Sequence, residues 1–332
     1  MQGKNKQVLL AARPQGAVKE ADFKIVETDI PAVGDGQVLV RNHFLSLDPY
    51  MRGRMDDSKS YAASQNLGEV MIGGTVGEVV ESKNAKFKVG DMVVGMYGWQ
   101  QYGVSDGAGL MKVDITHIPA SVYLGSVGMP GVTAWYGLTQ IGAPKPGETV
   151  VVSAASGAVG SVVGQLAKLK GCRAVGIAGG QAKCDYVVKE LGFDACIDYK
   201  KDTWFVDFKE ATPNGVDIYF DNVGGEILDN VLRRMNAFGR IPLCGLISQY
   251  NGEPYAMKNV RSLLVNRLKL QGFIVSEHME VWPQALKELG GYIATGKLKY
   301  RESVAQGLDN APKAFIGMLK GENFGKQVVK LI

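Results

Sequence analysis

The sequence predicts an α/β protein with two parts, a β-barrel-like N-terminal region followed by a doubly wound parallel sheet. Three observations support this prediction. Short β-branched runs separated by Gly and Pro fill the region from Gln7 to Val113. Strand and helix patterns then alternate from Thr149 onwards. The length of 332 residues is enough for about two domains.

The N-terminal region is expected to be built from strands, because its apolar runs are short and are bounded by turn residues. Its loops, such as 33–36 and 88–91, have the Gly and Asp content of turns. The expected strands are Gln7–Ala12, Phe23–Thr28, Gln37–Leu47, Thr75–Ser82 and Asp91–Met96. A helix is expected over Thr133–Gly142, ending before Pro144 and Pro146.

The alternation that follows predicts a parallel sheet with helices on both faces. The expected strands are Thr149–Val152, Arg173–Ala178, Ala195–Asp198, Asp217–Phe220, Arg240–Gly245 and Leu270–Val275. The expected helices are Ala158–Lys170, Lys183–Leu191, Ile227–Met235 and Trp282–Thr295. The tail carries a helix, Ala311–Leu319, and a strand, Lys326–Leu331, and we expect this tail to pack on the N-terminal region.

The first parallel strand leads into a turn of small residues. Thr149–Val152 lacks polar alternation, so it is expected to be buried on both faces. The turn places Ala155, Gly157 and Gly160 at the spacing of a dinucleotide-binding fingerprint, with Ala at the first glycine position. Small residues there allow a pyrophosphate to approach the backbone at the N-terminus of the next helix. Glycine-rich turns of this kind also arise from close packing alone.

The residues after the second strand indicate which nucleotide is bound. An NAD site needs a carboxylate about 20 residues beyond the glycines, to accept a hydrogen bond from the ribose 2′-hydroxyl. Here the segment 178–184 contains no carboxylate but carries the cation Lys183. A cation suits the 2′-phosphate of NADP, whereas a carboxylate would repel it. A solvated lysine is the alternative, but in a first helical turn it would oppose the helix dipole.

Composition excludes several other classes of protein. A net charge of +4 with scattered Lys and Arg does not suggest nucleic-acid binding. No apolar run is long enough to cross a bilayer and no signal-peptide pattern is present, so we expect a cytoplasmic protein without membrane contact. The cysteines (172, 184, 196 and 244) and the histidines (43, 117 and 278) are scattered. We therefore expect free thiols and no metal site.

Several longer motifs carry a family resemblance. The chain resembles zinc-free medium-chain dehydrogenases/reductases, in the branch of prostaglandin reductase, plant double-bond reductases and the bacterial curcumin-reductase-like group. The motifs are Ser46–Arg52, Gly128–Gly131, Ala154–Gly160, Lys168–Cys172, Asp221–Gly225, Gln271–Ile274 and Met318–Gly321. The resemblance implies a GroES-like β-barrel catalytic domain, residues 1–126 and 300–332, and a Rossmann NADP-binding domain, residues 127–299.

The resemblance also implies NADPH as the cofactor and a set of residues that contact it. These are Gly157, Ala158, Val159, Gly160, Gly179, Lys183, Tyr199, Asn222, Cys244, Gly245, Leu246, Ile247, Ser248, Tyr250, Phe273, Ile274, Val275 and Asn323. The chain departs from prostaglandin and plant relatives at Ser276, where they carry Tyr. The chain therefore offers no phenol at that position, and the hydrogen-bond donor must come from another residue.

The implied reaction is reduction of the C=C bond of an α,β-unsaturated ketone or aldehyde, with hydride delivered to the β-carbon and a proton to the α-carbon. The carbonyl oxygen then needs a hydrogen-bond donor. Tyr50 is the first candidate, Tyr250 the second, and Tyr61 lies in a loop that could cover the site. A quinone reductase using the same donor remains an alternative, as does a nucleotide-binding protein without catalysis.

A homodimer is also expected. The strand 268–275 is the last of the parallel sheet and is apolar, so pairing with its copy would cover an exposed edge. Members of the resembling family often form dimers in this way.

Overall fold

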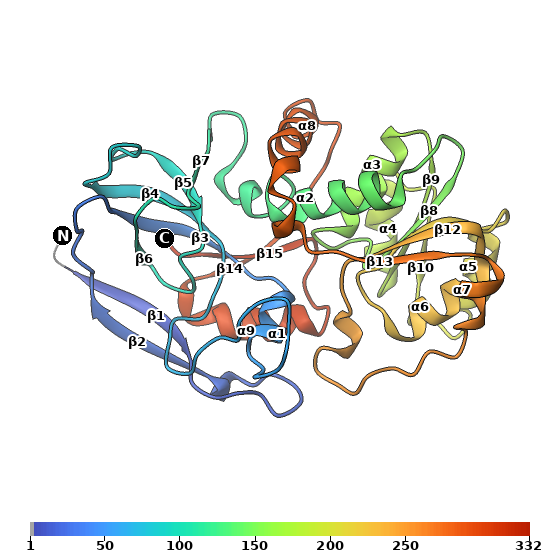
Figure 1. The fold of residues 1–332 in the computed structure, drawn as a ribbon, viewed down its shortest axis with the longest axis horizontal. Helices are drawn as coiled ribbons and strands as arrows, with labels where there is room; N and C mark the ends of the chain where they lie inside the picture. The colour runs from blue at the N-terminus through green and yellow to red at the C-terminus, as the bar shows by residue number, and fades with distance from the viewer. Residues whose placement is uncertain (1–2) are drawn as a thin grey trace. The chain divides into compact units, whose positions relative to one another are not determined.

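The structure is a computed structural model that describes residues 3–332, and the chain divides into two compact units (Figure 1). Unit 1 contains residues 3–124, Glu302–Asn323 and Gln327–Ile332. Unit 2 contains Gly125–Arg301 and Phe324–Lys326. Each unit has its own sheet and its own hydrophobic core.

Unit 1 is built on antiparallel strands. Its larger sheet has the order β14-β15-β3-β4-β5-β7, with β6 also paired to β3, and a second sheet pairs β1 with β2. The strands are β1 Lys4–Leu10, β2 Phe23–Asp29, β3 Val38–Ser46, β4 Thr75–Ser82, β5 Met92–Gly95, β6 Tyr102–Ser105, β7 Met111–Lys112, β14 Glu302–Gln306 and β15 Lys326–Lys330. The C-terminal strand β15 thus pairs with β3 from the start of the chain.

Two helices complete unit 1, α1 (Tyr50–Arg54) and α9 (Ala311–Leu319). Its core includes a fully buried Trp99, which stacks on Phe23 at 5.3 Å and meets the edge of Phe315 of α9 at 5.6 Å. Such aromatic pairs contribute about 0.5–1.5 kcal/mol beyond the area that they bury. This cluster joins the C-terminal helix to the N-terminal strands.

Unit 2 is a parallel sheet in the order β10-β9-β8-β11-β12-β13, which is the doubly wound pattern expected from the sequence. The strands are β8 Thr149–Ser153, β9 Arg173–Ala178, β10 Ala195–Asp198, β11 Val216–Phe220, β12 Met235–Leu243 and β13 Lys269–Gly272. All five residues of β8 are buried, as its unbroken apolar pattern predicts. The point where the strand order reverses lies between β8 and β11, and ligands of such sheets bind beyond the strand ends there.

Helices cover both faces of this sheet. They are α2 Met129–Tyr136, α3 Gly160–Leu169, α4 Gln181–Lys189, α5 Trp204–Ala211, α6 Gly225–Val231, α7 Arg261–Val265 and α8 Trp282–Ala294. One core cluster joins the sheet to α2, α3 and α8, and another joins it to α5 and α6. In Figure 1, α2 and α8 lie side by side.

Several boundaries differ from the sequence prediction. The helix expected at Thr133–Gly142 begins earlier, at Met129, because Pro130 fits its first turn, and it continues from Gly137 to Gly142 as a π-helix. Strand β13 ends at Gly272, so residues 273–275 lie outside the sheet. Helices α1, α5 and α7 and strands β6, β7 and β14 were not predicted. Within residues 3–332, no helix has the length and apolar character needed to span a membrane.

Candidate cofactor and active site

The glycine-rich turn after β8 is so closely packed that only glycine fits at residue 160. Ala154 takes a positive φ of 51°, and Gly157 donates its N–H to the Ala154 carbonyl at 2.9 Å. A Cβ on Gly160 would lie 2.3 Å from that same carbonyl oxygen. The turn, which also contains Ala158 and Val159, leads directly into α3. Its small side chains let a pyrophosphate approach the backbone at the N-terminus of α3, so the turn fits a dinucleotide.

A segment of the tail lies against this turn. Gly325 forms a parallel β-bridge with Gly157, and the Arg301 guanidinium lies 3.9 Å from the centroid of the Phe324 ring. The Phe324 ring also meets Tyr186 of α4 at 5.0 Å. Asn323, expected at the cofactor, directly precedes these residues. Sequence patterns did not single out Arg301 or Phe324, because their contacts depend on the return of the tail.

The loop after β9 brings two lysines together. Lys183 lies in the first turn of α4, and burial together with the charge of Lys200 lowers the pKa of Lys183. A Cβ on Gly179 would lie 3.1 Å from Lys200 Cε and 3.0 Å from the Tyr199 ring, so Gly179 allows both side chains to cross the loop. Two positive charges held close together repel each other, and an anion bound between them relieves this repulsion. This arrangement fits the 2′-phosphate of NADP.

Asp198 holds this loop in place. Its Oδ1 accepts hydrogen bonds from the N–H groups of Gly180 at 2.8 Å and Lys200 at 3.1 Å. The contribution of Lys200 was missed at the sequence level. The available signal was the pair Lys200–Lys201 immediately after a predicted strand, at the edge where ligands bind.

Asp221 and Asn222 organise the end of β11. Oδ1 of the buried Asp221 accepts hydrogen bonds from Ser153 Oγ (3.0 Å), Tyr219 OH (2.8 Å) and the N–H groups of Val223 and Gly224. Burial nevertheless raises the pKa of the Asp221 carboxyl. Asn222 is attached to the end of β8, because its N–H and its side-chain amide both donate to Ser153 at 2.9 Å. The two strands at the reversal point are thus fixed to each other.

The loop after β12 is tied to the same point. Cys244 and Gly245 donate their N–H groups to the Asp221 carbonyl, and Ile247 and Ser248 donate theirs to the carbonyls of Asn222 and Val223. Tyr250 OH accepts a hydrogen bond from the N–H of Leu246 at 3.2 Å. The structure therefore brings together the expected residues from 244 to 250 with Asn222.

Residues 273–275 directly follow the end of β13. The Phe273 ring packs 5.5 Å from Tyr136 and 6.2 Å from Phe220, so it contributes to the core between α2 and β11. Val275 is buried, whereas Ser276 is exposed. Phe273 and Ile274 are both partly buried, and contact of residues 273–275 with the nicotinamide stays a prediction.

The other candidate phenols lie in unit 1. Tyr50 begins α1, and burial followed by the charge of Asp48 raises the pKa of its hydroxyl. A phenol is protonated at neutral pH even at its ordinary pKa, and the shift moves the Tyr50 pKa further from neutrality, so Tyr50 is able to donate a hydrogen bond. Tyr61 is 55% exposed, and the Arg54 guanidinium lies 5.9 Å from its ring centroid. Arg54 and Tyr61 also influence the Tyr50 hydroxyl, so these three side chains share one neighbourhood.

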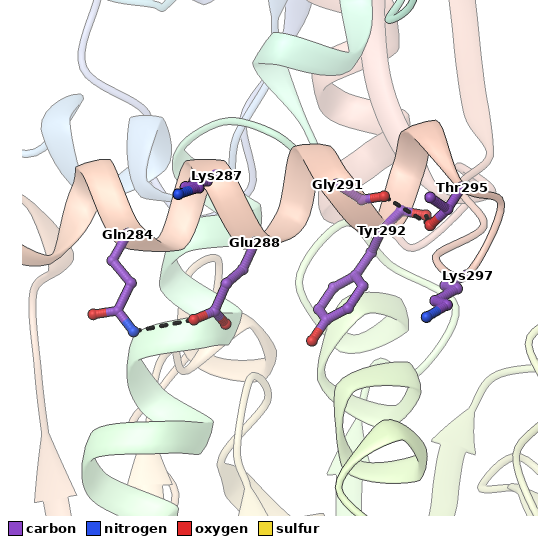
Figure 2. Close-up of a pocket in the computed structure, with 7 residues that line it drawn as sticks. All are labelled: Gln284, Lys287, Glu288, Gly291, Tyr292, Thr295 and Lys297. Carbon is purple, nitrogen blue, oxygen red and sulfur yellow. Dashed lines mark hydrogen bonds between the residues drawn. The ribbon is translucent and has the colours of Figure 1, made fainter.

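A separate concavity of about 510 Å³ follows one side of α8 in unit 2 (Figure 2). Several of its polar groups form hydrogen bonds within the protein. Gln284 donates to Glu288, which accepts a second bond from Trp135, and Thr295 donates to the Gly291 carbonyl. None of the expected cofactor residues lines it. We assign this surface no role in the reaction.

Comparison with known proteins agrees with this geometry. Residues 6–113 match a family described as the N-terminal domain of oxidoreductase, and residues 158–290 match one described as zinc-binding dehydrogenase. The chain is 46% identical to the NADPH-dependent curcumin reductase of Escherichia coli, with 99% of this chain and 97% of that protein covered. The chain belongs to the zinc-independent branch of the medium-chain dehydrogenase/reductase family.

Other members of the branch are similar over nearly their whole length. The 2-alkenal reductase of Nicotiana tabacum is 43% identical, with 98% of this chain and 97% of that protein covered. The crystal structure of Vibrio vulnificus CurA in complex with NADPH is 47% identical, has a TM-score of 0.94 and covers 98% of this chain and 99% of its own. Within residues 3–332, no group of three or more His, Cys, Asp or Glu side chains is placed to hold a metal.

Proposed function

We propose that the protein reduces the C=C bond of α,β-unsaturated ketones and aldehydes with NADPH. The observation that carries the cofactor assignment is the pair Lys183 and Lys200 at the loop where an NAD enzyme would place a carboxylate. The reaction is supported by end-to-end similarity to proteins named curcumin reductase, prostaglandin reductase and 2-alkenal reductase.

The residues of unit 2 bind and orient the cofactor. The turn Gly157–Gly160, at the N-terminus of α3, binds the pyrophosphate, and Lys183 and Lys200 bind the 2′-phosphate. Asn222 and the loop 244–250, joined through Asp221, hold the nicotinamide end. When bound, NADPH supplies the hydride that is added to the β-carbon of the substrate.

The chain must also stabilise the negative charge that develops on the substrate oxygen. We assign this task to the Tyr50 hydroxyl, which burial keeps protonated. A phenol that donates to the enolate oxygen stabilises the transition state more than the neutral ketone, and this difference accelerates the reaction. Tyr250 is the second candidate, and Tyr61 is proposed to cover the substrate from its exposed loop.

Steady-state kinetics with an aryl enone test the proposal. NADPH oxidation should accompany formation of a product that is two hydrogens heavier, with the carbonyl retained. Absence of NADPH consumption across several enones and enals would overturn the proposal. A higher kcat/KM on a simple quinone than on the enone would instead assign the protein as a quinone reductase. Binding of NADPH without turnover on any acceptor would indicate a nucleotide-binding protein.

We further propose a homodimer formed through β13. This strand is the last in the described sheet, and its outer edge pairs with no other strand of residues 3–332. Exposed apolar side chains occur on the strand and on its neighbouring elements: Leu270 on β13, Leu264 on α7 and Phe238 on β12, the strand paired with β13. Pairing of two copies would cover both edges.

We also propose that the protein resides in the cytoplasm.

A further inference from the structure

Two of the four cysteines face each other beside the proposed 2′-phosphate site. Cys196 lies on β10, where it is in register with Gly176 of β9. Its Sγ lies 3.2 Å from the point that a Cβ on Gly176 would occupy, and Val187 Cγ1 of α4 lies 3.0 Å from the same point. The Cys196 side chain is therefore on the face of the sheet that α4 covers.

Cys184 approaches from the helix. Cys184 and Val187 are three residues apart and are the two buried residues of α4, so both point toward the sheet. The thiols of Cys184 and Cys196 are neighbours, and each shifts the pKa of the other. Both cysteines are in the free thiol form. Two independent features, the strand register and the helical spacing, thus place the thiols opposite each other.

Cys184 differs chemically from the other three cysteines. Its neighbour Cys196 lowers the pKa of the Cys184 thiol. Interaction with Cys184 and burial raise the pKa of Cys196, and burial raises the pKa of Cys172 and raises that of Cys244 to about 12. The thiolate is the form of cysteine that attacks an oxidant, and a second thiol within reach converts the product into a disulfide. Cys184 is therefore suited to attack and Cys196 to resolve.

We propose that Cys184 and Cys196 form a redox modification site for hydrogen peroxide. The Cys184 thiolate attacks one peroxide oxygen, the O–O bond breaks, and a sulfenic acid forms while the other oxygen leaves as water after protonation. The Cys196 sulfur then attacks the Cys184 sulfur, the S–O bond breaks, and a second water leaves. The two thiols lose two electrons and two protons in total, and hydrogen peroxide is reduced to two waters.

The disulfide changes the cofactor site through its neighbours. An S–S bond is about 2.0 Å long, so closing it draws the first turn of α4 toward β10. That turn carries Lys183, and β10 ends at Asp198, which holds the loop at Gly180. This consequence rests on the proposed function of Lys183. Loss of one charge-assisted hydrogen bond to the 2′-phosphate corresponds to about a tenfold or greater weakening of NADPH binding.

The experiment treats the full-length protein with hydrogen peroxide and measures two things separately. Intact-mass and non-reducing peptide analysis should show loss of two hydrogens and a cross-link between the peptides of Cys184 and Cys196. Fluorescence titration should show NADPH affinity reduced about tenfold, with NADH affinity changed much less, and dithiothreitol should reverse both effects. The mass readout does not depend on the cofactor, so it remains informative if the reduced protein fails to bind NADPH, which would overturn the proposed function alone.

Two variants serve as controls. Cys196→Ser should bind NADPH normally when reduced and should keep that affinity after peroxide. Cys172→Ser, which alters a buried thiol bonded to the Lys145 carbonyl, should still form the cross-link. If Cys196→Ser fails to fold, Cys196→Ala serves for the same comparison. Absence of a Cys184–Cys196 cross-link, cross-linking of a different pair, or a cross-link that leaves NADPH affinity unchanged would overturn the proposal.

Discussion

At the scale of single residues, the choice of nucleotide depends on Lys183. Lys183→Glu replaces a cation by an anion next to the proposed phosphate position, beside Lys200. We expect the Kd for NADPH to rise about 10- to 100-fold, since one charge-assisted hydrogen bond is lost. The Kd for NADH should change far less, because NADH has no 2′-phosphate.

Isothermal titration with both nucleotides measures the effect. Lys189→Glu, at the exposed other end of the same helix, is the matched control and should leave both affinities nearly unchanged. Equal losses for NADPH and NADH in the Lys183 variant would show that the charge of this residue does not select the cofactor.

The carbonyl donor is the second prediction at this scale. Tyr50→Phe removes a hydroxyl that burial keeps protonated, and we expect kcat on an enone to fall about 10²- to 10³-fold, as for loss of an oxyanion donor. NADPH affinity should stay the same. Tyr292→Phe, in the concavity along α8, should have normal kinetics. A Tyr50→Phe enzyme with unaltered kcat, together with a slow Tyr250→Phe enzyme, would transfer the role to Tyr250.

At the scale of secondary-structure elements, the junction of β8 and α3 depends on Gly160. A Cβ there would lie 2.3 Å from the Ala154 carbonyl oxygen, so Gly160→Ala forces the backbone to move. We expect the free energy of unfolding to fall by about 1–3 kcal/mol. The thermal stabilisation given by NADPH should shrink as well, because the same turn binds the pyrophosphate.

Gly291→Ala is the control, and we expect it to raise the free energy of unfolding instead of lowering it. Gly291 lies inside α8, and nothing lies within 4 Å of an added Cβ. Alanine there should raise stability by up to about 1 kcal/mol through helix propensity. Thermal denaturation of the two variants, with and without NADPH, measures both effects. If Gly160→Ala were as stable as the unmodified protein, the close packing of this turn would not be limiting.

The same scale shows what sequence patterns can predict. Strands with a strong β-branched pattern and clear flanking turns, such as Thr75–Ser82 and Arg173–Ala178, were placed with the bounds that the structure has. Short or weakly patterned elements were missed. Strand β7 has two residues, and α5 fully buries only Phe208, while Trp204 and Phe205 are partly buried. Such elements are stabilised by neighbours that no local pattern reveals.

Some residues of the candidate site also have a local sequence pattern, and others do not. The glycine turn and Lys183 have local signatures, so the sequence indicated them directly. Lys200, Arg301 and Phe324 depend on contacts between segments far apart in the chain, and they emerged only from the structure. The placement of Phe273 at the nicotinamide is implied by family resemblance alone and stays a prediction; in the structure its ring packs 6.2 Å from Phe220.

At the scale of the whole molecule, the outer edge of β13 governs the proposed assembly. Leu270 on this strand is 38% exposed, and Leu270→Asp would place a charge in the proposed strand-to-strand contact. We expect light scattering to show a dimer for the unmodified protein and a monomer for the variant. Leu169→Asp, at a leucine that is 45% exposed at the end of α3, should remain dimeric. A monomeric unmodified protein would refute the assembly.

The pairing of β15 with β3 constrains the order in which the chain can fold during synthesis. Almost all of unit 2 is continuous and is made before β15, so its sheet can assemble while the ribosome is still translating. The end of β3, residues 44–46, lacks its β15 partner until that strand has been made. Contacts of such large sequence separation are slow to form. This end of β3 is therefore open to pairing with another chain while the protein is being made.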